Sequence, residues 1–304
     1  MEYVLTASSL SKRYRDFKAL DQLDLHVEKG AIYGFVGKNG AGKTTLIRLI
    51  CGLQDPTDGE YTLYGMKNTD PGIVKARRRM GAVVETPSIY LNMTAKENLQ
   101  AQYRILGLPS FEGIDQILQL VNLADTGKKK AKNFSLGMRQ RLGIAIALAG
   151  SPDFLVLDEP VNGLDPQGII EIRELILKLN REHQITFLIS SHILDELARL
   201  ATHYGFIDNG RMLKEISAKE MEESCRKCLR VEVSNMEALA RVMQQLGAEY
   251  KVISQTQADL FGEHNISKLT IALSQEGCIV HRIYEKDETL ESYYVNLVGG
   301  GRHD

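Results

Sequence analysis

The sequence predicts an α/β fold in which a mostly parallel β-sheet is flanked by helices and is followed by a small α+β domain. From Tyr3 to about Ser217, short apolar runs rich in β-branched or aromatic residues alternate with segments of helical periodicity, which is typical of such a sheet. After this point, polar motifs no longer follow the strand-like runs. We therefore predict a first domain over residues 1–217 and an accessory domain over residues 218–304.

Length and composition exclude several classes of protein. With 304 residues, of which 43% are hydrophobic, the chain can bury a large core and is long enough for about two domains. The longest aliphatic stretch, Ile144 to Ala149, is far shorter than the ~20 apolar residues of a membrane-spanning helix, and the first residues contain no signal-peptide core, so we expect a cytosolic protein. A formal net charge of −2 gives no electrostatic footprint for DNA or RNA, and no nucleic-acid partner is expected.

Three apolar runs are predicted as the central strands. They span Ala31–Val36, Phe154–Leu157 and Thr186–Ser190, and their short, continuous hydrophobic character is typical of strands covered on both faces. Each run ends in a polar motif. Because ligands gather at the carboxyl ends of the strands in open α/β sheets, we expect the three motifs to converge on one site.

A helical insertion is predicted between the first two of these strands. From about Thr94 to Leu148, apolar residues such as Ile114, Ile117 and Leu118 recur at helical rather than strand spacing. We therefore place a helical subdomain at about residues 86–150.

The accessory domain is predicted to mix strands and helices. Alternation in Leu229, Val231 and Val233 indicates a strand, and a helical pattern follows it. Three more strand-like runs and a last helix are expected at Lys251–Ser254, Lys268–Leu273, Ile279–Tyr284 and Thr289–Leu297, in that order. No motif in this domain is readable, so a packing or dimerisation appendage is the plainer interpretation and a regulatory sensor is the alternative.

The segment from Gly37 to Thr44 fits the phosphate-binding pattern GxxxxGK[ST] and lies between a predicted strand and a predicted helix, as the pattern requires. Glycines allow the backbone to curl so that successive N–H groups point at phosphate oxygens, and the helix beginning near Lys43 adds the positive end of its dipole. Lys43 is expected to neutralise the β- and γ-phosphates of a nucleoside triphosphate, and the Thr44 hydroxyl to ligate Mg²⁺. A glycine-rich turn that matches by accident is the alternative. The predicted nucleotide-binding residues of this segment are Gly37, Lys38, Asn39, Gly40, Ala41, Gly42, Lys43, Thr44 and Thr45.

Two acids and a histidine follow the other central strands. Asp158 and Glu159 end a buried strand, where packing alone would not place carboxylates. Asp158 fits a Mg²⁺ ligand, and Glu159 fits the general base for an attacking water, a role worth roughly 10²- to 10⁴-fold in rate. His192 follows the strand that ends at Ser190, and its imidazole could contact the γ-phosphate. The alternatives are surface acids at the start of a loop and a merely structural histidine.

The stretch Phe134–Gln140, with the sequence FSLGMRQ, lies between the phosphate-binding loop and the two acids. It looks like the signature of the ATP-binding cassette (ABC) family, which is normally LSGGQ. Ser135 stands 23 residues before Asp158 (158 − 135) and leads into a helix, as the family pattern does. Together with the two other motifs, this segment makes the chain resemble an ABC ATPase.

Three further positions agree with the resemblance, which covers about residues 3–217. Tyr14 occupies the adenine-stacking position, Asn162–Asp165 resembles the family's D-loop, and His192 resembles its switch histidine. The resemblance implies a cassette fold with a mostly parallel core sheet, an antiparallel β part and a helical subdomain. It also implies ATP as the nucleotide, bound with Mg²⁺ and hydrolysed.

Two positions depart from the family pattern. Glu85 stands where most members have a glutamine that serves Mg²⁺, and a carboxylate is still a hard oxygen ligand for that ion. Leu136 replaces the first glycine of the signature, while Ser135 and Gly137 keep the parts expected to touch the γ-phosphate of a nucleotide bound by the opposite copy. Both departures, together with the run Phe134–Arg141 and the sequence LESYY at Leu290–Tyr294, look like the bacitracin-resistance and lantibiotic-immunity branch of ABC exporters.

This resemblance also implies partners and a location. Two cassettes are expected to bind ATP head to tail, either as two copies of this chain or as this chain with another cassette. Each site would use the phosphate loop of one cassette and the signature of the other. A groove beside the helical subdomain is expected to hold a membrane permease on a separate chain, which would place the protein in the cytoplasm, peripheral on the inner face of the cell membrane. The implied activity is an ATPase that drives export, with a peptide antibiotic as the suggested cargo.

Two other readings of the motifs remain as alternatives. A soluble ABC ATPase acting on ribosomes or DNA is disfavoured, because ribosome-associated members resemble two cassettes in one chain. Repair members carry a long coiled coil between the motifs, whereas Lys43 and Asp158 are only 115 residues apart here (158 − 43). In a P-loop kinase, the signature stretch and Glu159 would have no purpose.

Overall fold

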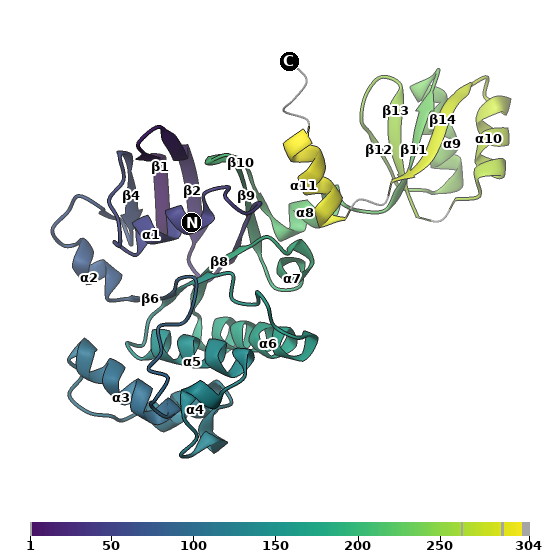
Figure 1. Cartoon of the computed structure of the whole chain (residues 1–304). Helices are drawn as coiled ribbons and strands as arrows, with labels where there is room; N and C mark the ends of the chain where they lie inside the picture. The colour runs from purple at the N-terminus through teal and green to yellow at the C-terminus, as the bar shows by residue number, and fades with distance from the viewer. Residues whose placement is uncertain (1, 263, 287–288, 300–304) are drawn as a thin grey trace. The chain divides into compact units, whose positions relative to one another are not determined.

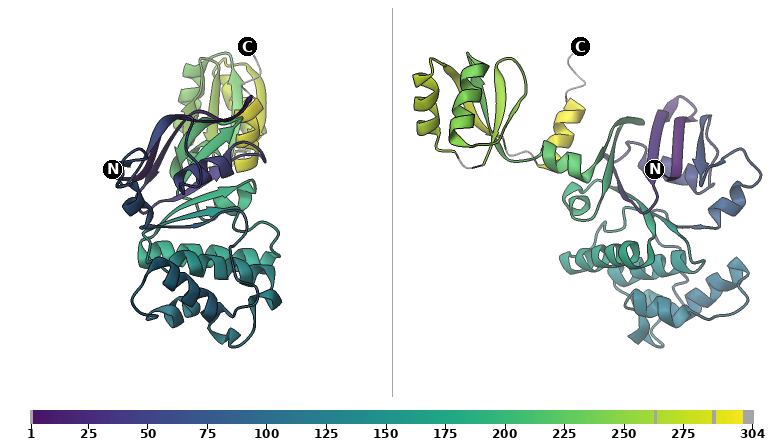
Figure 2. Two further views of the ribbon diagram at one scale, coloured as in Figure 1. Left: turned by 60° about the vertical axis from the view of Figure 1, so that its left-hand side comes forward. Right: turned by 180° about the vertical axis from the view of Figure 1, so that it is seen from behind.

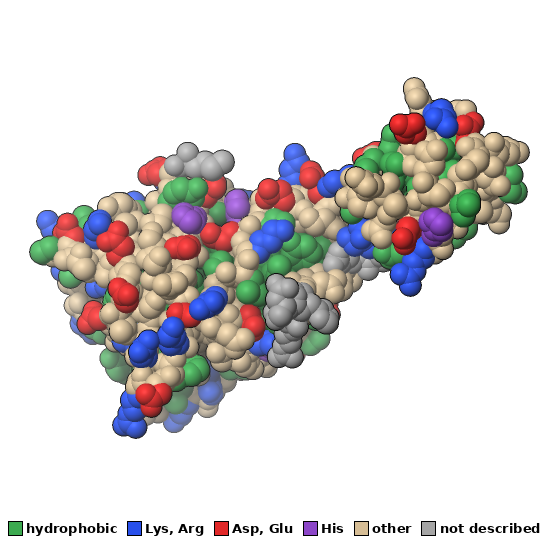
Figure 3. Space-filling model, turned by 90° about the horizontal axis from the view of Figure 1, so that it is seen from above, with side chains coloured by type: hydrophobic (Ala, Val, Ile, Leu, Met, Phe, Trp, Pro, Cys, Tyr) green, Lys and Arg blue, Asp and Glu red, His purple; other side chains and the backbone are tan. Residues whose placement is uncertain are grey.

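The computed structural model describes residues 2–262, 264–286 and 289–299, and the chain divides into two compact units, each with its own hydrophobic core (Figure 1). The first unit ends at Ala218 and the second begins at Lys219. Within the described ranges, no helix is both long and apolar enough to cross a membrane. On the face seen in Figure 3, acidic and basic side chains are mixed, in agreement with the small net charge.

A six-stranded sheet forms the centre of the first unit. Its strands are β3 (Ile32–Val36), β6 (Met80–Val83), β7 (Phe154–Asp158), β8 (Thr186–Ser191), β9 (His203–Asp208) and β10 (Arg211–Ser217). They lie in the order β10-β9-β3-β8-β7-β6, and all neighbours run parallel except β9 and β10. Every residue of β3, β7 and β8 is buried, as predicted for strands covered on both faces. Because Asp158 pairs with Ser190 and Val36 with Ser191, the carboxyl ends of these three strands meet at one edge.

Helices cover both faces of this sheet (Figure 2). On one face, α1 (Lys43–Ile50) shares a core with Val156 of β7 and with an antiparallel sheet. The strands of that sheet are β1 (Tyr3–Tyr14), β2 (Phe17–Glu28), β4 (Asp58–Leu63) and β5 (Met66–Lys67). On the opposite face lie α5 (Leu136–Leu148) and α6 (Pro166–His183). Two short helices, α2 (Ile73–Arg77) and α7 (Leu194–Ala198), complete this part of the chain.

The chain between β6 and β7 forms the predicted helical insertion. Its elements are α3 (Ala95–Leu106), α4 (Ile114–Leu120), α5 and short turns at Ala124–Thr126 and Ala131–Asn133. Helix α3 begins with a capping box, in which Thr94 and Glu97 each accept a hydrogen bond from the other's backbone N–H. At the entrance, Pro87 packs so closely on α5 that a Cβ at Gly143 would lie 2.7 Å from the proline ring. The loop after β6 is therefore tied to α5.

The second unit is built around an antiparallel sheet with two helices on one face. Its elements are β11 (Cys228–Val233), α9 (Met236–Leu246), β12 (Tyr250–Val252), β13 (Gln257–Phe261), α10 (Ile266–Gln275) and β14 (Val280–Lys286). The strand order β12-β13-β11-β14 and the β-α-β-β-α-β sequence correspond to a ferredoxin-like arrangement. Helix α8 (Ala218–Ser224) precedes it and α11 (Leu290–Gly299) follows it.

One strand predicted for this unit is wrong. Lys268–Leu273 was expected as a strand, but it lies within helix α10. Alternating Leu269, Ile271 and Leu273 suggest a period of two, yet only Leu269 and Leu273, four residues apart, are buried, while Ile271 is 59% exposed. The Asn265 side chain caps the helix by accepting the Lys268 N–H. The Asn265 cap and the burial of one face therefore favour a helix, although the apolar residues alternate as in a strand.

Candidate active site

The segment from Gly37 to Thr44 leaves β3 and curls into the start of α1. A Cβ at Gly37 would lie 2.7 Å from the carbonyl oxygen of Ile207, and one at Gly42 would lie 2.5 Å from that of Ala19. Gly42 also has a φ of +113°, which disfavours any side chain. The loop can follow this path only with glycine at both positions. Its middle residues, Lys38, Asn39 and Gly40, are exposed, whereas Ala41, Gly42 and Lys43 are buried.

The Lys43 ammonium is held inside this loop. Its Nζ donates to the carbonyl oxygens of Gly37 at 2.6 Å and Lys38 at 3.2 Å, and the side chain is only 6% exposed. The Glu159 carboxylate approaches the same nitrogen at 3.2 Å. A buried ammonium held this way is aimed at any anion that the loop binds. Thr45, also predicted for the site, lies half-buried in the first turn of α1.

Two oxygen groups meet beside the loop. The Thr44 hydroxyl donates to Asp158 Oδ2 at 2.9 Å, and the Ser190 hydroxyl donates to Asp158 Oδ1 at 2.5 Å. Asp158 itself is 2% exposed. A carboxylate and a hydroxyl oxygen in contact with each other are the kind of ligands that Mg²⁺ prefers, so these side chains fit the predicted ion.

Glu159 leaves the line of strand β7. Its φ of +50° lies in the left-handed region, and its N–H donates to the Ser190 hydroxyl at 3.0 Å. This turn directs the carboxylate away from the strand, where Oε2 contacts His192 Nδ1 at 2.7 Å and Oε1 faces Lys43. The structure therefore brings together Lys43, Glu159 and His192, the three predicted catalytic residues.

Glu85 lies at the end of β6, in the loop that enters the helical subdomain. Its carboxylate forms an ion pair with the Arg48 guanidinium of α1, and its φ is +60°. The described side-chain partner of Glu85 is thus the Arg48 guanidinium, and not Thr44 or Asp158, the residues that fit Mg²⁺. Ligation of Mg²⁺ by Glu85 stays a prediction.

Tyr14 ends β1, where it pairs with Phe17 of β2. Its hydroxyl donates to Gln54 in the loop after α1, and Lys12 Nζ lies 5.4 Å from the ring centroid. The residue is 38% exposed, so part of the ring remains open for the predicted stacking on adenine.

Ser135 and Gly137 lie at the start of α5, and this helix covers the opposite face of the sheet from α1 (Figure 1). The Ser135 hydroxyl caps α5 by accepting the Met138 N–H at 3.2 Å. A Cβ at Gly137 would meet no described atom closer than 3.9 Å, so the backbone is open there. Leu136 is 46% exposed, and its Cδ2 lies 3.4 Å from the Cβ position of Gly163 in the Asn162–Asp165 loop.

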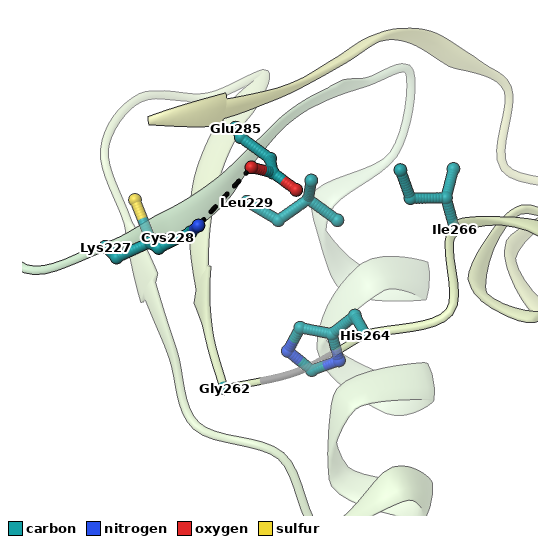
Figure 4. Close-up of a pocket in the computed structure, with 7 residues that line it drawn as sticks. All are labelled: Lys227, Cys228, Leu229, Gly262, His264, Ile266 and Glu285. Carbon is teal, nitrogen blue, oxygen red and sulfur yellow. Dashed lines mark ion pairs between the residues drawn. The ribbon is translucent and has the colours of Figure 1, made fainter. Parts of the chain in front are cut away.

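A pocket of about 560 Å³ in the second unit contains none of the predicted site residues (Figure 4). It lies beside the start of β11 and the ends of β13 and β14. Lys227 and Glu285 line it and form an ion pair with an Nζ–Oε2 distance of 3.5 Å. His264 contacts the carbonyl oxygen of Phe261 at 2.9 Å. The two charged residues of this pocket neutralise each other. In the first unit, by contrast, a phosphate-binding loop, two acids and a histidine lie together, so we take that cluster as the candidate active site.

Comparison with known proteins decides the family. The ABC transporter family model matches residues 20–162. The bacitracin transport ATP-binding protein BcrA of Bacillus licheniformis is 40% identical over 99% of both chains. The chain belongs to the ABC transporter ATP-binding family.

A second sequence relative and a solved structure agree with this family. The lantibiotic transport ATP-binding protein SrtF of Streptococcus pyogenes is 40% identical, over 70% of this chain and 90% of its own. The solved structure of the ADP conformation of MJ1267, an ATP-binding cassette of an ABC transporter, is 28% identical with a TM-score of 0.66, over 74% of this chain and 94% of that one. The ABC protein described here is thus an ATP-binding ATPase with the cassette fold, related to proteins of bacitracin and lantibiotic transport.

Sequence reasoning missed two residues that contact predicted site residues of this ABC ATPase. Ser190 was read only as the end of a strand, and Arg48 was not considered. The parallel register of β7 and β8, which sets Asp158 beside Ser190, is the signal that could have revealed the first. Arg48 has a weaker signal, its place four residues after Thr44 on one helix face.

We expect Ser190→Ala to lower kcat roughly ten- to hundredfold, because it removes the group that supports both Asp158 and Glu159. ATP affinity, measured by calorimetry, should change less than kcat. Ser191→Ala is the matched control, since this neighbour is equally buried but the described hydrogen bonds of its hydroxyl are both to the backbone of Ile193. Equal losses in both variants would show that the Ser190 hydroxyl has no special role.

Proposed function

We propose that this protein is the energy-supplying subunit of a peptide-antibiotic exporter, in which two copies bind ATP between them and drive a permease on a separate chain. The observation that carries the proposal is the division of the site between two faces of the first unit. Lys43, Glu159 and His192 gather at one edge, while Ser135 and Gly137 lie open at the start of α5. A signature that is exposed and lies on a different helix from the phosphate loop suits a head-to-tail partner.

The residues of the cluster divide the chemistry of ATP hydrolysis. Lys43 neutralises the phosphate chain inside the loop. Thr44 and Asp158 would hold Mg²⁺, which would supply positive charge to the phosphate chain. Glu159 accepts a proton from the attacking water, and His192 fixes the carboxylate through the 2.7 Å contact. A partner's signature serine and glycine would close the other side of the γ-phosphate.

A groove beside the helical subdomain supports the permease as partner. It has a volume of about 420 Å³ and lies between α1, the loop after β6 and α5. Its lining includes Leu53, Val84 and Ile146 beside the ion pair of Arg48 and Glu85, and Leu53 is 63% exposed. An exposed apolar surface with one charged pair fits a short amphipathic segment of another protein.

The names of two relatives support the proposed cargo class. BcrA is named for bacitracin transport and resembles this chain over nearly its whole length, and SrtF is named for lantibiotic transport. Both names refer to antibiotic peptides. We therefore assign a peptide antibiotic as cargo, residues 1–217 as the nucleotide-binding domain and residues 218–304 as an accessory domain. Bound to its permease, the protein would be peripheral on the cytoplasmic side of the membrane.

We expect Glu159→Gln to keep ATP binding and to accumulate an ATP-bound dimer, while steady-state hydrolysis falls roughly 10²- to 10⁴-fold. The amide keeps the shape of the side chain but cannot accept the proton. Light scattering with and without ATP measures the dimer, and a phosphate-release assay measures turnover. Glu174→Gln, which changes an exposed acid of α6, is the control. Unchanged turnover in Glu159→Gln would remove this residue from the role of base.

Co-purification separates the transport function from other ABC functions. From detergent-solubilised membranes of the native host, the tagged protein should recover a polytopic membrane protein. Leu53→Asp, which places a charge on an exposed side chain of the groove, should abolish this recovery while the protein still binds ATP. Recovery with ribosomes instead, or a membrane partner retained by Leu53→Asp, would contradict the proposed function or the proposed groove, respectively.

A further inference from the structure

The turn between β9 and β10 contacts the phosphate-binding loop. Asn209 and Gly210 form this two-residue turn, and both have a positive φ, as in the tight hairpins that Asn-Gly favours. The Gly210 N–H donates to the Ala41 carbonyl oxygen at 2.9 Å, and the Asp21 N–H of β2 donates to the Gly210 carbonyl oxygen at 2.9 Å. One glycine therefore connects β2 to the phosphate-binding loop.

The hydrogen bond to Ala41 fixes the direction of one peptide unit of the loop. A peptide is planar and trans, so its carbonyl oxygen and its N–H point in opposite directions. Because the Ala41 carbonyl is directed at Gly210, the N–H of Gly42 points away from the turn. A loop that binds phosphate needs N–H groups directed at the anion and carbonyl oxygens directed elsewhere, since the oxygens would repel it. The Gly210 N–H thus favours the orientation that phosphate binding requires.

Close backbone packing joins the turn, β2 and the loop. A Cβ at Gly210 would lie 2.8 Å from the Ala19 carbonyl oxygen of β2, and a Cβ at Gly42 would lie 2.5 Å from the same oxygen. On the β9 side, a Cβ at Gly37 would lie 2.7 Å from the Ile207 carbonyl oxygen. The loop is therefore enclosed between two backbones without intervening side chains, and a displacement of the turn would be passed on to it.

An ion pair holds the turn on β2. Arg211, which follows the turn, donates from Nε and Nη2 to Asp21 Oδ2 at 2.8 and 2.6 Å, and the Lys18 ammonium lies 3.0 Å from Asp21 Oδ1. Hydrogen bonds from these two cations lower the pKa of the Asp21 carboxyl, so it is charged at neutral pH. The Arg211 side chain is 65% exposed, and solvent therefore limits the strength of the pair.

We propose that the Asn209–Gly210 turn is part of the nucleotide site and that Asp21 and Arg211 are positioning residues for it. The turn keeps the Ala41 carbonyl oxygen directed away from the phosphates, and the ion pair keeps the turn on β2. Neither charged residue needs to touch the nucleotide. The inference rests on the proposed nucleotide site and extends that site to a hairpin far along the chain.

Two glycine variants separate this contact from backbone strain. Gly210→Ala places a side chain against the Ala19 carbonyl. Gly65→Ala is the matched control, because Tyr64 and Gly65 form the same kind of positive-φ turn between β4 and β5, where a Cβ would meet nothing within 4 Å. We expect Gly210→Ala to weaken binding of Mg²⁺-ADP, measured by calorimetry, about three- to tenfold, the effect of one lost hydrogen bond. Equal affinities in the two variants would overturn the inference.

A double-mutant cycle tests the ion pair, and it also tests the turn if Gly210→Ala does not fold. Arg211→Gln and Asp21→Asn should each raise the dissociation constant of Mg²⁺-ADP about two- to fivefold, and the double variant should lose no more, because both changes release the same turn. Arg211→Lys keeps the charge and should retain most of the affinity. Lys67→Gln, which breaks an exposed pair with Glu60 in the sheet that contains β2, is the control. Additive losses, no losses, or losses matched by Lys67→Gln would overturn the role of the pair.

Steady-state kinetics supplies a readout that a loss of folded protein would not give. The KM for ATP should rise with the ADP dissociation constant, while kcat changes less than about twofold, because bound phosphates themselves hold the peptide between Ala41 and Gly42. A lower kcat at unchanged KM would indicate fewer folded molecules and contradict the inference. Lys43→Ala is the control for the nucleotide site and should abolish ADP binding. If it does, unchanged affinity in Gly210→Ala and Arg211→Gln contradicts the role of the turn and leaves the ATPase function standing.

Discussion

The site depends on one hydroxyl group, that of Ser190. It donates to Asp158 and accepts the N–H of Glu159, so it supports two consecutive acids at once. In a regular strand, neighbouring side chains point to opposite faces of the sheet. The left-handed turn at Glu159 breaks this rule and lets one acid face Thr44 while the next faces Lys43 and His192. The parallel register of β7 on β8 is what places Ser190 where it can do this.

Much of this arrangement can be predicted from the sequence, because the residues of each motif are close together along the chain. The spacing of Gly37, Gly42 and Lys43 predicts the loop, and the structure shows that Cβ atoms at the two glycines would clash with backbone carbonyls. The partners of Glu85 are different. Its departure from the family pattern is visible in the sequence, but the contact with Arg48 joins residues 37 positions apart and depends on how β6 lies beside α1. Pattern spacing carries no such information.

The second unit shows a similar limit. Its mixed α+β character was predictable, but the segment around Leu269 has an apolar pattern that fits either period, and the polar cap at Asn265 decides for a helix. Strand β13 was not predicted, because its centre holds Asp259. That acid is only 6% exposed; burial opposes its charge, yet two hydrogen bonds from Arg230 lower its pKa. Arg230 of the neighbouring strand β11 thus stabilises a buried acid in the middle of β13, and spacing along the sequence does not reveal this contact.

The central claim is that each ATP site uses Glu159 of one copy and Ser135 of another. Two inactive variants test it most directly, Glu159→Gln and Ser135→Phe, assayed alone and after mixing. In a head-to-tail pair, a mixed dimer has one site with both defects and one site with none, so ATPase activity should reappear on mixing. If the mixture stays as inactive as either variant alone, although mixed dimers form, the site is not shared between copies and the account is wrong.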